Sequence, residues 1–148
     1  MARWEYNSPE ERLFLSDGKK VYFYVPADKQ VRQDELKEAI DDRLPLMFLL
    51  GRSNLRGEFE RFETLPVKPE IEGTMVIQMY PKRKTALREL VMEVEPESFL
   101  IRRLVLTNED GSRNDFRFSN ILVNSRLKAP LFQFTVPPGT KVLQGLGQ

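Results

Sequence analysis

Apolar and polar residues alternate along most of the chain, with the two-residue period of a β-strand that has one buried face. At the N-terminal end, this pattern predicts strands around Trp4 and Tyr6, at residues 13–15 and at residues 20–25. The Asp17-Gly18 pair favours a tight hairpin between the last two, because glycine accepts positive φ. Later strands are expected at residues 62–67, 74–80, 87–94, 99–107, 115–122 and 131–136.

This pattern gives about nine strands in all. Polar turns at residues 81–84 and 108–111 join consecutive strands, and helices do not alternate with strands along the chain. The fold class expected is therefore mainly β (α+β), with a strongly curved antiparallel sheet. We expect one domain over residues 1–148 and a frayed Gly- and Gln-rich tail at residues 143–148.

A helical island interrupts the strands. Residues 33–42 are rich in helix-forming Asp, Glu, Leu, Lys and Ala. Residues 44–50 are apolar all round and end at Gly51, a plausible helix cap, and a second short helix starts near Ser53.

The strands predict a sheet with one apolar and one polar face. The polar face is expected to meet water and carries Glu89, Glu93, Arg103, Arg117, Ser119 and Gln133. The apolar face carries Leu90, Met92, Val94, Leu104, Leu106, Phe116, Phe118, Phe132, Phe134 and Val136.

Two interpretations of the apolar face remain open. Patterning alone favours a packed core closed by the helical island. Alternatively, the island forms a lid that opens over a ligand cavity. The lid residues would be Leu46, Phe48, Leu49, Leu50, Phe59 and Phe62, which we expect in short helices between strands.

Composition excludes most reaction chemistry. The 148 residues include no Cys and no His, so thiol chemistry, imidazole catalysis and the commonest metal ligands are absent. The paired carboxylates and the glycines form no catalytic or phosphate-binding motif, so we expect no enzyme, no metal and no cofactor. A net charge of +1 indicates no nucleic-acid partner. The first residues lack the apolar run and cleavage site typical of a signal peptide, so none is expected here, and no apolar stretch is long enough to predict a membrane-spanning helix.

Four blocks of sequence resemble the LolA family of lipoprotein carriers. They are RWEYNSP at residues 3–9, LSDGKKVYFYVP at 15–26 with QV at 30–31, PLMFLLG at 45–51, and FQFTVPPG at 132–139. Each block alone is common, but their order and spacing match the family over nearly the whole chain.

The resemblance implies an incomplete β-barrel with a short helical lid, in the periplasm. Such carriers take acylated lipoproteins from an inner-membrane releasing transporter, shield the acyl chains in a concave apolar cavity, and pass them to an outer-membrane acceptor. Residues expected to contact lipid are then Trp4, Leu46, Phe48, Leu49, Leu50, Phe59, Phe62, Leu90, Met92, Leu104, Leu106, Phe116, Phe118, Phe132 and Phe134.

One difference from the family affects these expectations. The family's first helix, its first strands and its functional arginine lie upstream of the segment matched here, so Arg3 inherits no role. Two alternatives to a carrier remain. One is a lipid-responsive interaction module of the same fold, like the stress sensor RseB, and the other is an inactive fragment whose apolar face is closed core or a homodimer interface at exposed sheet edges.

Overall fold

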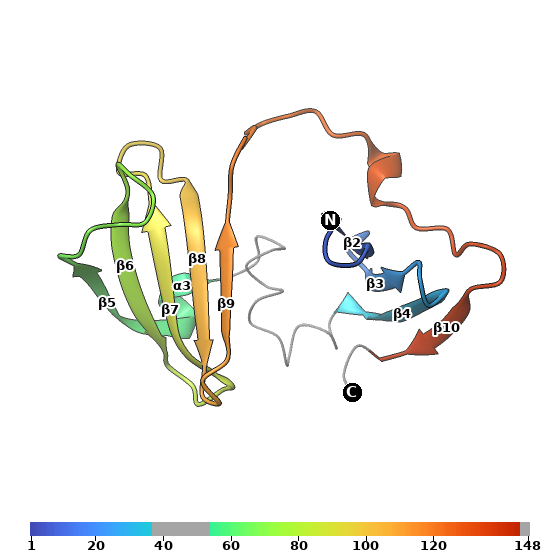
Figure 1. Ribbon diagram of the computed structural model, residues 1–148, viewed down its shortest axis with the longest axis horizontal. Helices are drawn as coiled ribbons and strands as arrows, with labels where there is room; N and C mark the ends of the chain where they lie inside the picture. Colours follow the sequence, from blue (N-terminus) through green and yellow to red (C-terminus); the bar gives the residue numbers. More distant parts are fainter. Residues whose placement is uncertain (37–53, 146–148) are drawn as a thin grey trace. The chain divides into compact units, whose positions relative to one another are not determined.

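The computed structural model describes residues 1–36 and 54–145, and this part of the chain consists mainly of β-strands. Strands make up 48% and helices 7%, which confirms the predicted mainly-β class. The strands form two open five-stranded sheets (Figure 1). Residues 1–52 with 125–148 make one compact unit, here called the N/C unit, and residues 53–124 make a second, the central unit.

The N/C unit contains a sheet with the strand order β1-β2-β3-β4-β10. Its first four strands pair as antiparallel neighbours. The predicted Asp17-Gly18 hairpin is present: Asp17 Oδ1 accepts hydrogen bonds from the Lys19 and Lys20 amides at 2.7 and 2.8 Å, and Gly18 has a φ of 99°. The strands are β1 (Ala2–Tyr6), β2 (Arg12–Ser16), β3 (Lys20–Val25), β4 (Gln30–Glu35) and β10 (Lys141–Gln144).

Strand β10 corrects the prediction of a frayed tail from residue 143. It pairs in parallel with β4, placing Val142 opposite Val31, and the two ribbons run side by side in Figure 1. The Lys141 amide donates to the Lys29 carbonyl at 2.9 Å, and the Gly145 amide donates to the Gln33 carbonyl at 3.0 Å. The local pattern could not show this pairing, because the partner strand lies more than a hundred residues away. Residues 146–148 lie outside the described part of the chain.

The central unit contains an antiparallel sheet whose strands follow sequence order, β5-β6-β7-β8-β9. The predicted polar turns after β6 and β8 are both present. The short helix expected near Ser53 is α3 (Leu55–Glu58), capped by the Asn54 side chain, which accepts the Gly57 amide at 3.1 Å. The strands are β5 (Phe59–Leu65), β6 (Met75–Pro81), β7 (Leu87–Val94), β8 (Ile101–Asn108) and β9 (Arg113–Arg117).

Two helix predictions are wrong where the structure describes the residues. Residues 33–35, expected to begin a helix, continue β4 because they pair with β3, with Gln33 opposite Tyr22. Phe59 and Phe62 lie in strand β5 rather than in short helices. Pairing with a neighbouring strand outweighs weak local helix preference at both places. The rest of the helical island, residues 37–53, lies outside the described residues.

Two strand predictions are also wrong in the C-terminal third. Strand β9 ends at Arg117 and does not reach Leu122. The strand expected at residues 131–136 is absent, and a 3-10 helix, η1 (Ala129–Phe132), occupies its start. Pro130 stands in the first turn of η1, where its fixed φ and missing amide donor are tolerated.

Candidate functional site

One face of the N/C sheet carries a small apolar cluster. Trp4 lies opposite Phe14 across the β1–β2 ladder, and Phe14 lies opposite Phe23 across the β2–β3 ladder. The predicted site residue Trp4 therefore belongs to this cluster. Its members are Ala2, Phe14, Val21 and Leu36, all buried, with Trp4 and Phe23 packed against them.

The opposite face of the same sheet is covered by the segment that contains Phe134. The Phe134 ring packs against the rings of Tyr22 and Tyr24, with centroids 5.3 and 5.6 Å apart. Tyr22 and Tyr24 alternate with Phe23 along β3, so they point to the other side of the sheet from the Trp4 cluster. Trp4 and Phe134, both predicted to contact lipid, thus lie on opposite faces and do not share one surface.

A hollow of about 390 Å³ brings Trp4 together with another predicted residue, Phe132. It lies at the edge strand β1, beside η1, and we call it the β1 hollow. Trp4 and Phe132 are each half-buried there. The residues that line it are Met1, Ala2, Arg3, Trp4, Leu127, Leu131 and Phe132.

Arg3 ties the two walls of the β1 hollow together. Its Nη1 donates to the Leu131 carbonyl at 3.1 Å, and its Nε donates to Glu5 Oε1 at 2.6 Å. Arg3 is the sole charged residue among those that line the hollow, and its charge is paired with Glu5. The hollow therefore offers a mainly apolar surface, suited to an apolar ligand group.

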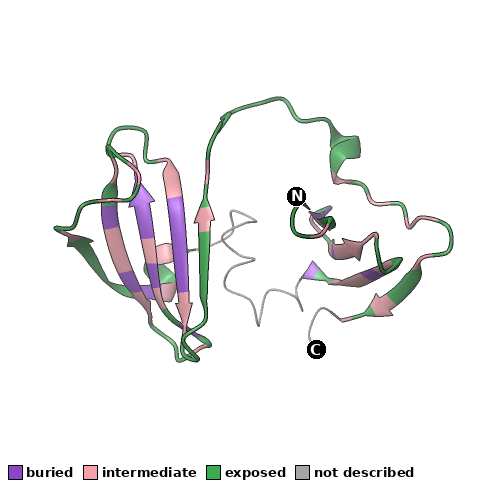
Figure 2. Cartoon of the chain, in the orientation of Figure 1, coloured by how far each residue is buried: buried purple, intermediate pink, exposed green. Residues whose placement is uncertain are grey.

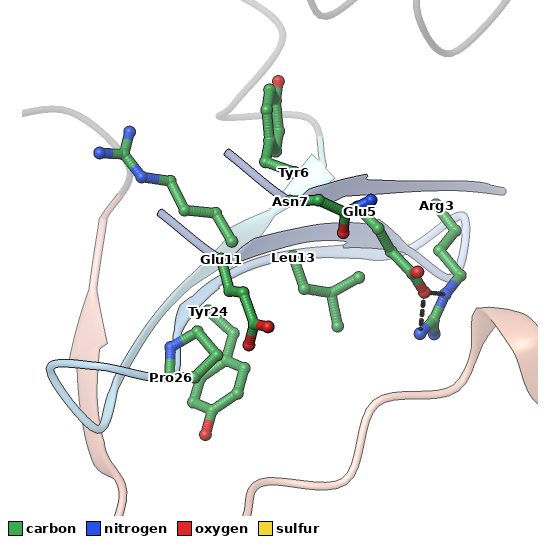
Figure 3. A pocket seen from close by; sticks show the side chains of 9 residues that line it. Arg3, Glu5, Tyr6, Asn7, Glu11, Leu13, Tyr24 and Pro26 are labelled. Atoms are coloured by element: carbon green, nitrogen blue, oxygen red, sulfur yellow. Dashed lines mark hydrogen bonds and ion pairs between the residues drawn. The ribbon is translucent and has the colours of Figure 1, made fainter. Parts of the chain in front are cut away.

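A second pocket in the N/C unit has a different character. It has a volume of about 300 Å³, and four of its nine lining residues are charged: Arg3, Glu5, Glu11 and Arg12. In Figure 3, Leu13 lies between the Arg3–Glu5 ion pair and Glu11, and Tyr24 and Pro26 lie near Glu11 on the side away from that pair. Its two arginines balance its two glutamates, so the pocket selects neither an anionic nor a purely apolar ligand.

In the central unit, the predicted apolar face is already packed. Leu90 lies opposite Leu106 and Met92 lies opposite Leu104 across the β7–β8 ladder. All four side chains are 5% exposed or less, and Figure 2 shows this burial along the two strands. They serve as core in this structure, so their predicted contact with lipid stays a prediction that would require the core to open.

The other predicted residues of the central unit differ in exposure. Phe59 is 1% exposed and Phe62 is 47% exposed, although both belong to β5, which is irregular between Glu60 and Glu63. Phe116 and Phe118 are half-buried. The remaining predicted residues, Leu46, Phe48, Leu49 and Leu50, lie outside the described residues.

The sequence pattern predicts that the polar face of the central sheet meets water. The structure shows that part of this face is buried. Glu93 and Arg103 are only 2% and 8% exposed, and Arg103 Nη1 donates to Glu93 Oε1 at 2.8 Å. Arg103 also holds Asp115 with two hydrogen bonds, at 2.9 and 2.7 Å. The Glu93 carboxylate in turn accepts the Glu70 and Ile71 amides at 3.1 and 2.7 Å. A buried charge needs such partners, and here they fasten the β5–β6 loop to the sheet.

These contacts shift the pKa values of the three groups. Burial alone would raise the pKa of Glu93, but hydrogen bonds from Arg103 and from the Ile71 and Glu70 amides bring it below its ordinary value. The paired Arg103 guanidinium lowers the pKa of Asp115 despite some burial. The hydrogen bond to Asp115, helped by Glu93, raises the pKa of Arg103. All three groups are thus held in their charged forms.

The described residues contain neither a metal-binding cluster nor a membrane-spanning helix. Nowhere in residues 1–36 and 54–145 do three or more Asp and Glu side chains gather as a metal ion would need. Within the same residues, no helix has the length and apolar character required to cross a bilayer.

Comparison with known proteins matches this chain to one family. The model of the outer membrane lipoprotein carrier protein LolA matches residues 1–135. The chain belongs to the LolA family. Curated relatives include the outer-membrane lipoprotein carrier proteins of Nitrosomonas europaea and Azotobacter vinelandii, each 30% identical to it. The matches cover 96% and 97% of this chain.

The chain spans about two thirds of the length of these LolA relatives, 66% for Nitrosomonas europaea and 67% for Azotobacter vinelandii. The carrier protein of Pseudomonas syringae pv. tomato, 27% identical, is matched over the same 67% of its length. The family assignment made from the four sequence blocks is confirmed.

The sequence predicted only two of the seven residues that line the β1 hollow. It named Trp4 and Phe132 but neither Leu127 nor Leu131. A signal was present, because Leu127 and Leu131 lie four positions apart in a proline-containing stretch that leads to Phe132. Their role emerges only when η1 meets β1, two segments joined by a hydrogen bond between residues 128 positions apart.

Proposed function

We propose that this protein carries lipoproteins by shielding their acyl chains, and that the β1 hollow holds part of an acyl chain. It acts by binding and release, without a reaction or a cofactor. As a member of the LolA family it would work in the periplasm, receiving cargo from an inner-membrane transporter and delivering it to an outer-membrane acceptor. One half-barrel domain formed by both units remains part of this proposal.

The observation that carries the proposal is the composition of the β1 hollow. Trp4, Leu127, Leu131 and Phe132 surround about 390 Å³ of space. Leu127 and Leu131 are still 63% and 43% exposed, so part of this apolar surface is accessible. Covering it with an acyl chain would remove apolar surface from water on both partners.

The energy of burying an acyl chain explains why a shallow hollow suits a carrier. Each buried CH₂ group contributes about 0.8 kcal/mol, so full burial of a long chain would be too strong for release. An open hollow covers only part of the acyl chain. The rest of the acyl chain would bind to protein surfaces that are closed in this structure and would have to open. The packed face of Leu90, Met92, Leu104 and Leu106 in the central unit is a separate candidate surface, predicted from the sequence, that would have to open.

The first experiment uses an environment-sensitive apolar dye bound to the purified protein. A triacylated lipopeptide is titrated in, with the same peptide lacking acyl chains as control. We expect only the acylated peptide to displace the dye, at a stoichiometric ratio. Displacement by both peptides, or by neither, would contradict carriage of acyl chains.

A second experiment locates the bound chain. Trp4 is the single tryptophan of the sequence and lines the β1 hollow. A lipopeptide with brominated acyl chains should quench Trp4 fluorescence, because bromine quenches only at close contact. Stoichiometric dye displacement without quenching would keep the carrier proposal but remove the β1 hollow from it.

A matched pair of variants tests the hollow independently of Trp4. Leu131 and Val142 are 43% and 44% exposed, and only Leu131 lines the hollow. Leu131→Ser should weaken lipopeptide binding about tenfold, the effect of losing roughly 1.5 kcal/mol of leucine burial. Val142→Ser should leave the affinity unchanged, and an equal loss in both variants would contradict the assignment.

A further inference from the structure

A short exposed apolar segment follows strand β9 in the central unit. Ile121, Leu122 and Val123 are 38%, 81% and 63% exposed, although all three are large and apolar. Single exposed apolar residues are ordinary, but three in a row are a defect unless they serve a function. These three residues form what we call the ILV tip.

The backbone around the ILV tip is bent on both sides. Asn120 and Asn124 adopt left-handed conformations, with φ of 52° and 57°. Asparagine tolerates this region better than most residues, so both bends are compatible with the sequence. The tip is not part of a helix or a strand.

The surrounding sequence carries one sign of charge. From residue 116 to residue 148 there is no Asp or Glu, while Arg117, Arg126, Lys128 and Lys141 are basic. Arg126 and Lys128 are exposed and follow the tip closely. Lys128 lies five positions after Val123, so the chain itself keeps them within about 18 Å.

We propose that the ILV tip, with Arg126 and Lys128, touches the surface of an anionic membrane. Apolar side chains insert at the headgroup boundary, and basic side chains pair with anionic lipid. This inference rests on the proposed function, because a carrier that loads and unloads acyl chains must come close to lipid surfaces. It assigns that approach to residues outside the β1 hollow.

Other binding partners of the ILV tip are less consistent with the basic charge of residues 116–148. A second copy of this chain would place the same basic residues against one another, since the segment lacks acidic partners. An acidic protein partner would need an apolar patch of matching shape beside its charges, and nothing in the described residues of this chain indicates such a shape. An anionic lipid surface supplies both an apolar interior and negative charge.

The test uses a single introduced cysteine, because the chain contains none. Leu122→Cys is labelled with an environment-sensitive dye and mixed with vesicles of phosphatidylglycerol and phosphatidylcholine in equal parts. The matched control is Phe99→Cys. Phe99 is 75% exposed, like Leu122, but it follows Glu95 and Glu97 in an acidic turn. We expect a blue shift for the label at position 122 and none at position 99.

The charge dependence is measured by sedimentation of unlabelled protein with the same vesicles. Each basic side chain near an anionic surface contributes about fivefold to partitioning, so Arg126→Gln with Lys128→Gln should weaken it by tenfold or more. Replacing Leu122 by Ser should weaken it several-fold. Pure phosphatidylcholine vesicles should bind poorly, and added salt should release the protein.

Three outcomes would overturn the inference: equal blue shifts at positions 122 and 99, binding that ignores lipid charge, or a concentration-dependent dimer that Leu122→Ser abolishes. The last outcome would assign the ILV tip to a second copy. The proposed function is judged separately, by lipopeptide displacement and Trp4 quenching in the absence of vesicles. Loss of vesicle binding with intact lipopeptide binding would refute only the membrane contact.

Discussion

At the scale of single residues, the least expected feature is the buried ion cluster of Glu93, Arg103 and Asp115. The alternation of residues places Glu93 and Arg103 on the same, polar face of the sheet. This part of the prediction is correct, because the two residues lie opposite each other across the β7–β8 ladder. Their burial could not be predicted, since it depends on the β5–β6 loop folding back to donate two amides to Glu93. The ion cluster therefore holds the β5–β6 loop against the sheet through these two hydrogen bonds.

Glu93→Gln should strongly destabilise the central unit. The substitution keeps the shape of the side chain but removes its charge and one acceptor oxygen, which leaves Asp115 as the charged partner of Arg103 in this cluster. Breaking a buried ion pair from one side costs about 3 kcal/mol. Urea unfolding measures the loss, and amide hydrogen exchange at Glu70 and Ile71 should speed up because their acceptor is weakened.

The control is Glu63→Gln on strand β5, where the side chain is exposed. Surface substitutions of this kind change stability by less than about 0.5 kcal/mol. If both variants lose the same stability, or if exchange at Ile71 is unchanged, the Glu93 carboxylate does not hold the loop.

The same cluster predicts how stability depends on pH. The pKa values of Glu93 and Asp115 are both lower in the folded state than their ordinary values. The unfolded chain therefore binds more protons in acid, so their stabilisation is complete above about pH 5 and is lost as the pH falls through the folded-state values. Unfolding free energies measured across this range should rise with pH, and the rise should be smaller in Asp115→Asn. An unchanged slope in that variant would contradict the assignment.

At the scale of elements, the sequence predicted what is local and missed what depends on distant partners. The Asp17-Gly18 hairpin and the polar turns of the central sheet follow from short-range turn chemistry, and all are present. Strand β10 was not predicted, and its last two residues were assigned to the tail at 143–148, because residues 141–144 form a strand only beside β4. The site shows the same limit: Trp4 and Phe132 were named, but the hollow that joins them needs η1 to pack at β1.

Lys141→Pro tests whether β10 is a stabilising element. Proline removes the amide that donates to the Lys29 carbonyl, so the first link of the parallel pair is lost. We expect a loss of about 1 to 3 kcal/mol in unfolding free energy. Lys141→Ala keeps the amide and should be near neutral, because the side chain is exposed. Equal stability of the two variants would mean that residues 141–144 behave as a loose tail.

At the scale of the whole molecule, the order of the segments determines how the two units depend on each other. The N/C unit is built from both ends of the chain, and the central unit is inserted between them as residues 53–124. Strands β5 and β9 are the two edges of the central sheet, four strand spacings or roughly 20 Å apart. Strands β5 and β9 run in the same direction, so the chain enters at one end of the sheet and leaves at the other. A folded central unit therefore fixes the distance between the two points at which it connects to the halves of the N/C unit.

Unfolding of the central unit should destabilise the N/C unit through this connection. Residues 53–124 would become a flexible loop of 72 residues, whose closure costs about 4 kcal/mol plus a constant that depends on chain stiffness. We therefore expect one cooperative transition, as the prediction of a single domain requires.

Trp4 lies in the N/C unit and is the single tryptophan, so its fluorescence follows that unit alone. Glu93→Gln, a change in the central unit, should shift the Trp4 transition as far as the circular dichroism transition of the whole chain. If the Trp4 transition stays in place while circular dichroism shows an earlier step, the units fold independently, and the two sheets are then separate domains rather than one half-barrel.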